Sequence, residues 1–269
     1  MEFFGLLGEK LSHSLSPDIH NELLRLINRE GAYKLFEVEK NNLKEFIEAI
    51  KLLKIKGCNV TIPYKKAVME YIDIISDEAK SIGAINTISL KDGKLYGYNT
   101  DYFGFGYMLK VSNIDVANKI VVILGNGGAS RAVLQYLLNN DVLSVYIVSR
   151  NPNYHEYNND KIKVINYKEL ESIDADILVN TTPVGMYPNI DSSPVNEEII
   201  NKYSALVDII YNPIETKFLA LGKQLNKKTV GGLYMLVGQA VKAEEIWQDI
   251  DIEESVIEKI YKKIEKKLI

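Results

Sequence analysis

Three short stretches of the sequence concentrate hydroxyl, amide, ammonium and carboxylate side chains. They are residues 12–17, residues 59–65, and a third stretch in two halves, 86–87 and 99–101. Taken singly, each has a structural explanation: a helix cap, a lysine at a strand end, or an Asx turn. Taken together, they supply hydroxyl, amide, ammonium and carboxylate groups at the ends of elements, where small polyols are typically held. The sequence therefore indicates a candidate site for a polyhydroxylated small molecule.

A second chemical signal is a glycine-rich turn between a strand and a helix. The apolar run at 120–124 is typical of a strand covered on both faces, and Gly-Asn-Gly-Gly-Ala-Ser follows at 125–130. Such a turn presents backbone N–H groups and a helix dipole to a phosphate. Gly125 suits the tight turn, and Gly127 lets the backbone approach a pyrophosphate. The segment predicts a dinucleotide site, the alternative being a plain connection between strand and helix.

The end of the next strand bears on which dinucleotide binds. An NAD site carries an acid about 20 residues after the glycines, where it binds the ribose 2′-hydroxyl. Here the strand at 145–148 is followed by Ser149 and Arg150, and the first acid is Glu156. Arginine can neutralise a 2′-phosphate and stack on adenine, although a solvated arginine at a strand end is common. The sequence predicts NADP rather than NAD.

The elements that position these residues alternate between helix and strand. Ser16 followed by Pro17 predicts a helix start capped by the serine. Further strands are expected at 32–38, 57–62, 84–90 and 94–98, and a helix at 43–53. The last two strands flank an Asp-Gly pair, which is a strong hairpin signal. The first hundred residues are therefore expected to form a mixed α/β unit.

Strands and helices alternate regularly beyond residue 119. Strands are expected at 120–124, 145–148, 177–179 and 206–209, followed by a long helix through Trp247 and a last helix over roughly 253–268. This alternation predicts a parallel, doubly wound sheet of the Rossmann type. The predicted fold class is therefore α/β, with an N-terminal mixed unit and a doubly wound nucleotide-binding unit.

Six segments of the chain share their order and residues with one known family. They are Ser-x-Ser-x-Ser-Pro at 12–17, Asn-Val-Thr-Ile-Pro-Tyr-Lys at 59–65, Gly-Ala-Ile-Asn-Thr at 83–87, Asn-Thr-Asp at 99–101, Gly-x-Gly-Gly-Ala-Ser at 125–130 and Gly-Gly-Leu-x-Met-Leu-Val-x-Gln at 231–239. Through them the chain resembles shikimate dehydrogenase over essentially its whole length. The resemblance implies reversible, NADP-dependent reduction of 3-dehydroshikimate to shikimate, in chorismate and aromatic amino-acid biosynthesis. It also implies a substrate-binding domain at 1–101, an NADP-binding Rossmann domain at 102–232, and C-terminal helices at 233–269 that return to the substrate domain.

The resemblance assigns roles residue by residue. Lys65 would donate and accept the proton, and Asp101 would orient both its ammonium group and the reacting hydroxyl. The substrate would be bound by Ser14, Ser16, Thr61, Asn86, Asp101, Tyr211 and Gln239. The cofactor would be bound by Asp77, Gly125, Asn126, Gly127, Gly128, Ala129, Ser149, Arg150, Ile209 and Gly232. No metal is expected, because the histidines at 13, 20 and 155 lack the spacing of metal ligands.

The chain departs from the family pattern in one place. Many members carry a second basic residue shortly after the arginine, where this chain has Asn153 and Tyr154, so some use of NADH is expected.

Three other functions compete with the one that the resemblance implies. The nearest alternative is a relative that oxidises quinate, often with NAD; the serine hydroxyls at 14 and 16 favour shikimate. Lys65 and Asp101 argue against a non-catalytic nicotinamide sensor. A folate-linked dehydrogenase would leave the serine-rich loop unexplained.

Composition restricts the class of protein. The 269 residues are 46% hydrophobic and 25% charged, which excludes a disordered chain. A net charge of −4 argues against nucleic acid as the main partner. No stretch approaches about 18 uninterrupted apolar residues, so no membrane span is expected. The one cysteine, Cys58, is expected to be a small buried residue and fits a reducing cytoplasm. A monomer and a homodimer are both compatible with the sequence.

Overall fold

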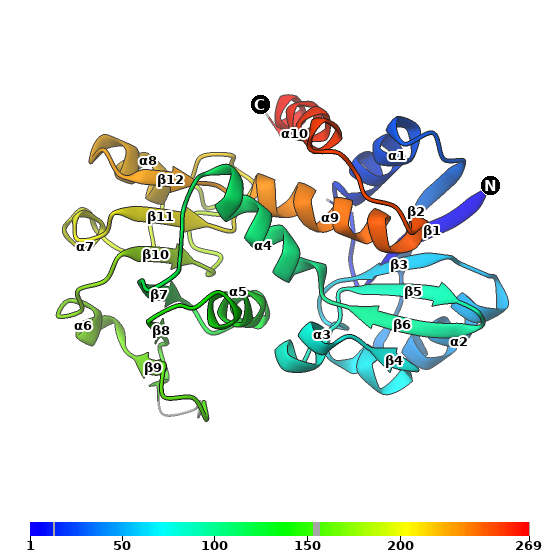
Figure 1. The fold of residues 1–269 in the computed structure, drawn as a ribbon, viewed down its shortest axis with the longest axis horizontal. Helices are drawn as coiled ribbons and strands as arrows, with labels where there is room; N and C mark the ends of the chain where they lie inside the picture. The colour runs from blue at the N-terminus through cyan, green and yellow to red at the C-terminus, as the bar shows by residue number, and fades with distance from the viewer. Residues whose placement is uncertain (13, 153–156, 269) are drawn as a thin grey trace. The chain divides into compact units, whose positions relative to one another are not determined.

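A computed structural model describes residues 1–12, 14–152 and 157–268 of the chain. The histidines at 13 and 155 and the acid at 156 lie outside the described residues. The chain divides into two compact units, which are described separately: unit 1 comprises Met1–Phe103 and Val237–Lys267, and unit 2 comprises Gly104–Leu236 and Leu268 (Figure 1). Within the described part of the chain, no helix combines the length and apolarity needed to span a membrane.

Unit 1 is built on a six-stranded mixed sheet. Its N-terminal elements are β1 (Glu2–Gly8), α1 (Ser16–Leu26), β2 (Gly31–Glu37), η1 (Lys40–Asn42), α2 (Leu43–Leu52), β3 (Gly57–Val60), η2 (Ala67–Tyr71), β4 (Ile74–Ile75), α3 (Asp77–Ile82), β5 (Thr87–Lys91) and β6 (Lys94–Tyr98). The strand order is β2-β1-β3-β5-β6-β4. β5 pairs antiparallel with β3 and with β6, and the other pairs are parallel. The mixed α/β unit predicted for the first hundred residues is confirmed.

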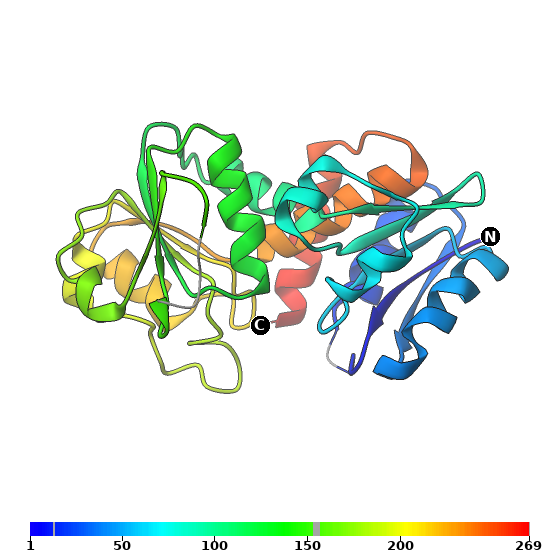
Figure 2. The same cartoon turned by 90° about the horizontal axis from the view of Figure 1, so that it is seen from below.

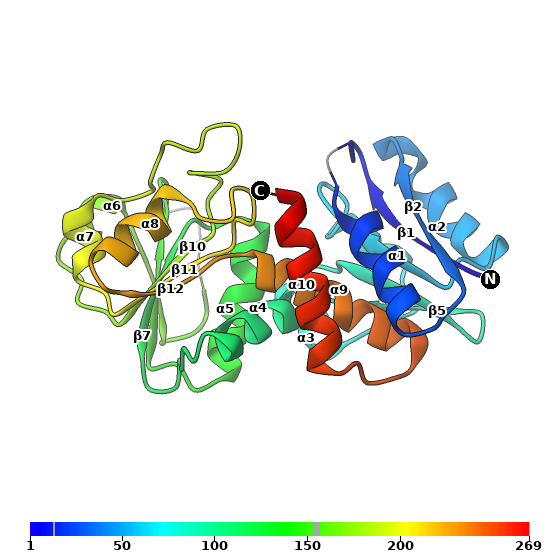
Figure 3. The same ribbon diagram turned by 90° about the horizontal axis from the view of Figure 1, so that it is seen from above.

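Helices cover both faces of the unit 1 sheet. On one face, α2 packs Leu43 and Ile47 into a cluster that contains Cys58 of β3. On the other face, Phe4 of β1 packs with residues of α1 and with Trp247, near the end of α9 (Leu233–Gln248). Figure 3 shows α1 lying along β1 and β2. Cys58 is fully buried, and burial raises the pKa of its thiol to about 12, which makes it an unreactive core residue.

Unit 2 is built on a parallel six-stranded sheet. Its elements are β7 (Ile120–Leu124), α5 (Gly128–Asn139), β8 (Ser144–Val148), β9 (Ile162–Ile165), α6 (Tyr167–Leu170), β10 (Ile177–Asn180), α7 (Glu197–Asn201), β11 (Ala205–Asp208), α8 (Lys217–Gln224) and β12 (Lys228–Val230). The helix α4 (Thr100–Val111) begins in unit 1 and ends in unit 2, and α9 runs from unit 2 into unit 1. A last helix, α10 (Glu254–Leu268), follows.

The strands of unit 2 follow the order β12-β11-β10-β7-β8-β9, which is the Rossmann order. Alternate residues of each strand enter separate cores. Val121 and Ile123 of β7 pack with α4 and α5, whereas Val122 and Leu124 pack with α6, α7 and α8. Figure 2 shows the green α5 on one side of the strands and the yellow and orange helices on the other. The predicted doubly wound sheet is therefore confirmed.

Three local predictions were wrong or incomplete. α1 begins at Ser16 itself, with Leu15 at the N-cap position, and the leucine side chain has no acceptor with which to cap the helix. The strand predicted at 57–62 ends at Val60, because a turn follows it. The strands β1, β4, β9 and β12 were not predicted; β4, β9 and β12 are only two, four and three residues long.

Candidate active site

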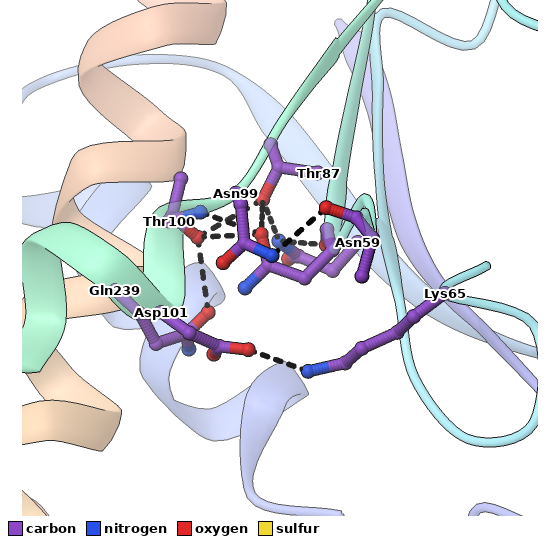
Figure 4. Close-up of polar contacts among 9 residues, drawn as sticks. Asn59, Lys65, Thr87, Asn99, Thr100, Asp101 and Gln239 are labelled. Atoms are coloured by element: carbon purple, nitrogen blue, oxygen red, sulfur yellow. Dashed lines mark hydrogen bonds and ion pairs between the residues drawn. The ribbon is translucent and has the colours of Figure 1, made fainter. Parts of the chain in front are cut away.

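An ion pair between Lys65 and Asp101 lies where two elements of unit 1 begin or end. After β3, a turn closed by the hydrogen bond from Tyr64 N to Thr61 O (2.9 Å) leads directly to Lys65. Asp101 is the second residue of α4. Lys65 Nζ donates to Asp101 Oδ2 over 2.6 Å, and the two side chains are 28% and 16% exposed (Figure 4). Each partner orients the other, and the pair stays accessible to a ligand.

A buried amide fixes the start of the helix that carries Asp101. Asn86 Oδ1 accepts hydrogen bonds from Thr100 N (2.6 Å) and from Thr87 Oγ1 (3.0 Å), and it also lies 3.1 Å from Thr100 Oγ1. Thr100 Oγ1 is 3.4 Å from Oε1 of Gln239, on α9 (Figure 4). Because the amide oxygen of Asn86 is committed to these donors, its Nδ2 is the group that remains to donate to a ligand.

Two residues of this network were missed by sequence reasoning. Tyr33 donates its hydroxyl hydrogen to Asn59 Oδ1 (2.7 Å), and Asn59 Nδ2 donates to Thr87 Oγ1 (3.0 Å). Both side chains are buried. Asn59 stands two residues before Thr61 in a recognised motif, so its position carried a usable signal. Tyr33 lies in an ordinary strand pattern and carried none.

A fully buried pair of titratable side chains lies behind Tyr33. His20 Nδ1 is 2.7 Å from Glu244 Oε1, and neither side chain is exposed. The His20 ring stacks on Tyr33, with centroids 4.2 Å apart and planes 6° from parallel. Gln248 Nε2 is the other donor to Glu244, at 3.5 Å. Among the described residues, His20 Nε2 has no hydrogen-bond partner.

The other residues predicted for unit 1 are placed as follows. Ser14 and Ser16 stand at the start of α1, and Thr61 follows β3, where its N–H bonds to Leu7 O (2.9 Å). Asp77 is the first residue of α3, with a fully exposed carboxylate 3.3 Å from Lys80 Nζ. The contacts described above therefore join Lys65 to Asp101 and join Asn86 to Gln239 through Thr100, but they do not include Asp77.

In unit 2, the predicted glycine turn joins β7 to α5. Gly125 has a φ of +98°, and a Cβ there would lie 3.0 Å from Thr182 Cγ2, so glycine is required. Gly127 is the N-cap of α5, Gly128 is its first residue, and Ala129 follows in the first turn. A Cβ added to Gly127 or Gly128 would meet nothing within 4 Å. Open space over two glycines at a helix N-terminus fits a phosphate group.

A pocket of about 560 Å³ lies beside this turn. It is lined by residues 125–127, 149–151 and 181–184, which follow β7, β8 and β10, and by Tyr167. The strand order reverses between β7 and β10, and ligands bind at such switch points in open parallel sheets. Arg150 is exposed and lines the pocket. The residues present therefore fit a dinucleotide that carries a negatively charged adenosine end.

A tyrosine that was not predicted contacts the turn. The Tyr157 hydroxyl donates to Asn126 Oδ1 over 2.7 Å, which fixes the side chain of Asn126 at the pocket wall. Asn126 Nδ2 is buried and has no partner among the described residues. No sequence motif signals the contact, because 31 residues separate its partners.

Three further predicted residues lie after β11. Gly232 N donates to Ile210 O (2.9 Å), and a Cβ at Gly232 would lie 2.0 Å from Ile209 O. Backbone packing alone therefore requires glycine at 232. Tyr211 is half-buried, and burial raises the pKa of its hydroxyl. Tyr211 belongs to unit 2, whereas the other predicted substrate residues belong to unit 1.

A buried carboxylate holds the loop in which Tyr211 lies. Asp208 accepts hydrogen bonds from Thr216 Oγ1 (2.7 Å), Ile210 N (3.1 Å) and Asn180 Nδ2 (3.1 Å). Burial raises the pKa of Asp208 to about 6, and the three hydrogen bonds offset part of that effect. The carboxylate thus ties the end of β10 to the start of α8.

The raised pKa of Asp208 predicts a loss of stability as the pH rises from about 4 to 7. The ordinary pKa is 3.8, so over this window the folded chain binds the proton more tightly than the unfolded chain. At about 1.4 kcal/mol per pKa unit, the loss at pH 7 is about 3 kcal/mol. Urea unfolding followed by circular dichroism should show the wild type losing that much relative to Asp208→Asn. A difference between the two proteins that stays constant from pH 4 to pH 7 would contradict the prediction.

The candidate residues of unit 1 and those of unit 2 supply different chemical groups. Unit 1 offers an ammonium group beside a carboxylate, an arrangement suited to moving a proton at a hydroxyl or carbonyl oxygen. Unit 2 offers a glycine turn and an adjacent pocket suited to a dinucleotide. Together they support oxidation and reduction of an alcohol and a ketone. Among the described residues, no group of three or more potential ligands could hold a metal ion.

Comparison with known proteins points to one family. Residues 6–88 match the family model described as the shikimate dehydrogenase substrate binding domain. The NADP(+) shikimate dehydrogenase of Clostridium beijerinckii is 58% identical over 97% of both chains. Shikimate dehydrogenase 1 of Peptoclostridium difficile superimposes over the whole of both chains, with a TM-score of 0.91 and 51% identity. The Thermus thermophilus shikimate 5-dehydrogenase, solved with NADP(H) and shikimate, has a TM-score of 0.86 and 31% identity over 98% of this chain and 99% of its own.

Proposed function

The chain belongs to the shikimate dehydrogenase family, and on that basis we propose how its own residues carry out the NADP-dependent, reversible reduction of 3-dehydroshikimate to shikimate. The observation that carries the proposal is the 2.6 Å contact between Lys65 Nζ and Asp101 Oδ2. A proton-transfer pair must be partly exposed, because the substrate oxygen has to reach it, and both members of this pair are partly exposed.

Lys65 transfers the proton and Asp101 orients it. During reduction the ketone oxygen gains negative charge, and the Lys65 ammonium donates a proton to it as the hydroxyl forms. The neutral amine then recovers a proton from solvent. During oxidation the amine accepts the hydroxyl proton. Asp101 holds the Lys65 side chain through their 2.6 Å contact and directs its N–H bonds toward the reacting oxygen.

The remaining polar residues of unit 1 bind the substrate. Asn86 donates through Nδ2, the atom that its contacts with Thr87 and Thr100 leave available. Ser14, Ser16 and Thr61 bind through their hydroxyls, and Gln239 binds through its side-chain amide. Tyr211, in unit 2, is proposed as a further substrate contact.

The pocket and turn of unit 2 bind NADP. When bound, NADPH supplies the hydride that adds to the ketone carbon. Gly127 and Gly128 leave the backbone N–H groups of the turn open to the pyrophosphate, and Arg150 and Ser149 line the adenosine end. The proposed assignment also includes Gly125, Asn126, Ala129, Ile209, Gly232 and, in unit 1, Asp77.

The domains are proposed to divide the work accordingly. Residues 1–101 bind the substrate, residues 102–232 bind NADP, and the C-terminal helices at 233–269 complete the substrate domain. The small-molecule ligands and the single buried cysteine support a cytoplasmic enzyme. Light scattering on the purified protein distinguishes the monomer from the homodimer.

Replacing Arg150 with alanine is expected to weaken NADP binding by about 10–100-fold and to change NAD binding by less than about 2-fold. A guanidinium hydrogen bond to a phosphate contributes roughly 1.5–3 kcal/mol, and only NADP carries the 2′-phosphate. Fluorescence titration with each cofactor measures both constants. Arg29→Ala, which removes an exposed arginine of unit 1, is the matched control. Equal losses of affinity for NADP and NAD would show that Arg150 does not bind the 2′-phosphate.

Nicotinamide absorbance during oxidation of shikimate and of quinate, each offered with NADP and with NAD, tests the function as a whole. Rapid reduction with shikimate and NADP alone supports the proposed reaction. Comparable rates with quinate and NAD would favour the broader quinate-oxidising relative. Cofactor binding by folded protein without turnover of any pair would favour a nicotinamide sensor.

A further inference from the structure

Tyr167 is placed at the adenosine end of the unit 2 pocket by local structure. Ser149 N donates to Ile165 O (2.9 Å), so the end of β8 is joined to the end of β9. The next residue, Asn166, caps α6: its Oδ1 accepts from the backbone N–H groups of Lys168 and Glu169 (both 2.9 Å). Glu169 Oε2 in turn accepts from Asn166 N (2.8 Å). This reciprocal cap fixes Tyr167 as the first residue of α6.

The Tyr167 side chain has two different surroundings. Its ring packs against the hydrophobic cluster that includes Val148, Ile165 and Leu170, which restrains its position. The same residue lines the pocket together with Ser149, Arg150 and Asn151. Burial raises the pKa of Tyr167 and the charge of Arg150 lowers it, which indicates that the hydroxyl lies near the guanidinium group. At pH 7 the hydroxyl keeps its proton and is a donor.

The positive charge at this end of the pocket does not balance a phosphate dianion. Arg150 is the cation that lines the pocket among the described residues, and its side chain is exposed. Neither Ser149 nor Asn151 carries a charge. A 2′-phosphate has three acceptor oxygens, so a single guanidinium group leaves acceptors for a further donor.

We infer that Tyr167 is a cofactor-specificity residue, whose hydroxyl donates a hydrogen bond to the 2′-phosphate of NADP alongside Arg150 while its ring forms an apolar wall of the adenosine site. The inference rests on the NADP use proposed above. Many family members carry a second basic residue shortly after the position of Arg150, and this chain does not. The inference gives Tyr167, which follows β9, the additional phosphate contact that such a residue would make.

Calorimetric titration with two cofactor fragments tests this assignment without turnover. Adenosine 2′,5′-bisphosphate carries the 2′-phosphate, and adenosine 5′-monophosphate lacks it. Tyr167→Phe keeps the ring and removes the hydroxyl, so it should bind the bisphosphate about 10-fold more weakly and the monophosphate within about 2-fold of wild type. Tyr167→Ala should weaken binding of both fragments. The matched control is Tyr146→Phe, since Tyr146 lies on β8 outside the pocket lining and its ring faces Lys163.

Two outcomes would overturn the inference. Tyr167→Phe that binds the bisphosphate as tightly as wild type would show that the hydroxyl makes no contact with the phosphate. Equal weakening for both fragments would assign the hydroxyl to the ribose or adenine instead. Failure of the proposed function looks different: wild-type protein would then bind both fragments equally, or would bind them and not turn over shikimate with NADP.

Discussion

Lys65→Ala is expected to lower kcat by about 10²–10⁴-fold, with a much smaller change in KM. This is the usual contribution of a positioned general acid or base, equivalent to roughly 3–5 kcal/mol in the barrier. The structure places the ammonium 2.6 Å from Asp101, so removing it also leaves the carboxylate without its cation. The effect falls on kcat because the proton moves only as charge develops on the reacting oxygen. Steady-state rates of shikimate oxidation, measured at saturating NADP, give both constants.

The neighbouring lysine provides a matched control. Lys66 is exposed and follows Lys65 directly, so Lys66→Ala removes the same charge from the same turn. It should retain kcat within about 2-fold of wild type. A Lys65→Ala enzyme with near-normal kcat and a raised KM would assign Lys65 to substrate binding rather than to proton transfer.

His20→Leu is expected to destabilise unit 1 by about 3–5 kcal/mol. The change removes the 2.7 Å partner of Glu244 and leaves a completely buried carboxylate whose remaining donor, Gln248, is 3.5 Å away. Removing one member of a buried pair is costly because the other loses its compensation. Trp247 is the single tryptophan of the chain, and its ring lies 5.2 Å from that of His20. Urea unfolding followed by tryptophan fluorescence therefore reports the stability of unit 1 directly.

The double variant His20→Leu with Glu244→Leu tests whether the loss of stability comes from the unpaired Glu244 side chain or from lost packing of the His20 ring. Replacing both partners of a buried hydrogen bond by apolar residues of similar volume can be nearly neutral, so the double variant should recover most of the loss. A double variant as unstable as His20→Leu alone would show that the histidine ring matters for its stacking on Tyr33. The predicted electrostatic role of the pair would then be wrong.

Unit 2 was the more predictable part of the fold. Its strands at 120–124 and 177–179 are continuous apolar runs, and the turn between β7 and α5 places Gly125 at a φ of +98°, which favours glycine. Such signals depend on residues close in sequence, so the pattern and the structure agree. The strands β9 and β12 lie at the edges of the sheet and are short, and they carry too few alternating residues to be recognised.

The buried contacts that support the candidate active site could not be predicted from the sequence. The His20–Glu244 contact joins α1 to α9 across 224 positions, and Tyr33 meets Asn59 across 26. Neither contact follows a period or a motif, because tertiary packing alone brings these side chains together. The residue type of Ser16 predicts that it caps the helix, yet Ser16 is the first residue of α1 and Leu15 is at the N-cap position. Local preference therefore placed the helix start within one residue and assigned the cap to the wrong residue.

Unit 1 is discontinuous in the chain, and this has a consequence for protein synthesis. Trp247 fills the space over Gly57, where a Cβ would lie 2.2 Å from its ring, and its Nε1 donates to Ile88 O (2.9 Å). β1, β3 and β5 therefore lack one cover of their sheet until the second half of α9 leaves the ribosome. At 5–20 residues per second, translation from Phe103 to Trp247 takes roughly 7–30 s. The segment Gly104–Leu236, which forms almost all of unit 2, is complete before then, so the half of the protein made first is the half that finishes folding last.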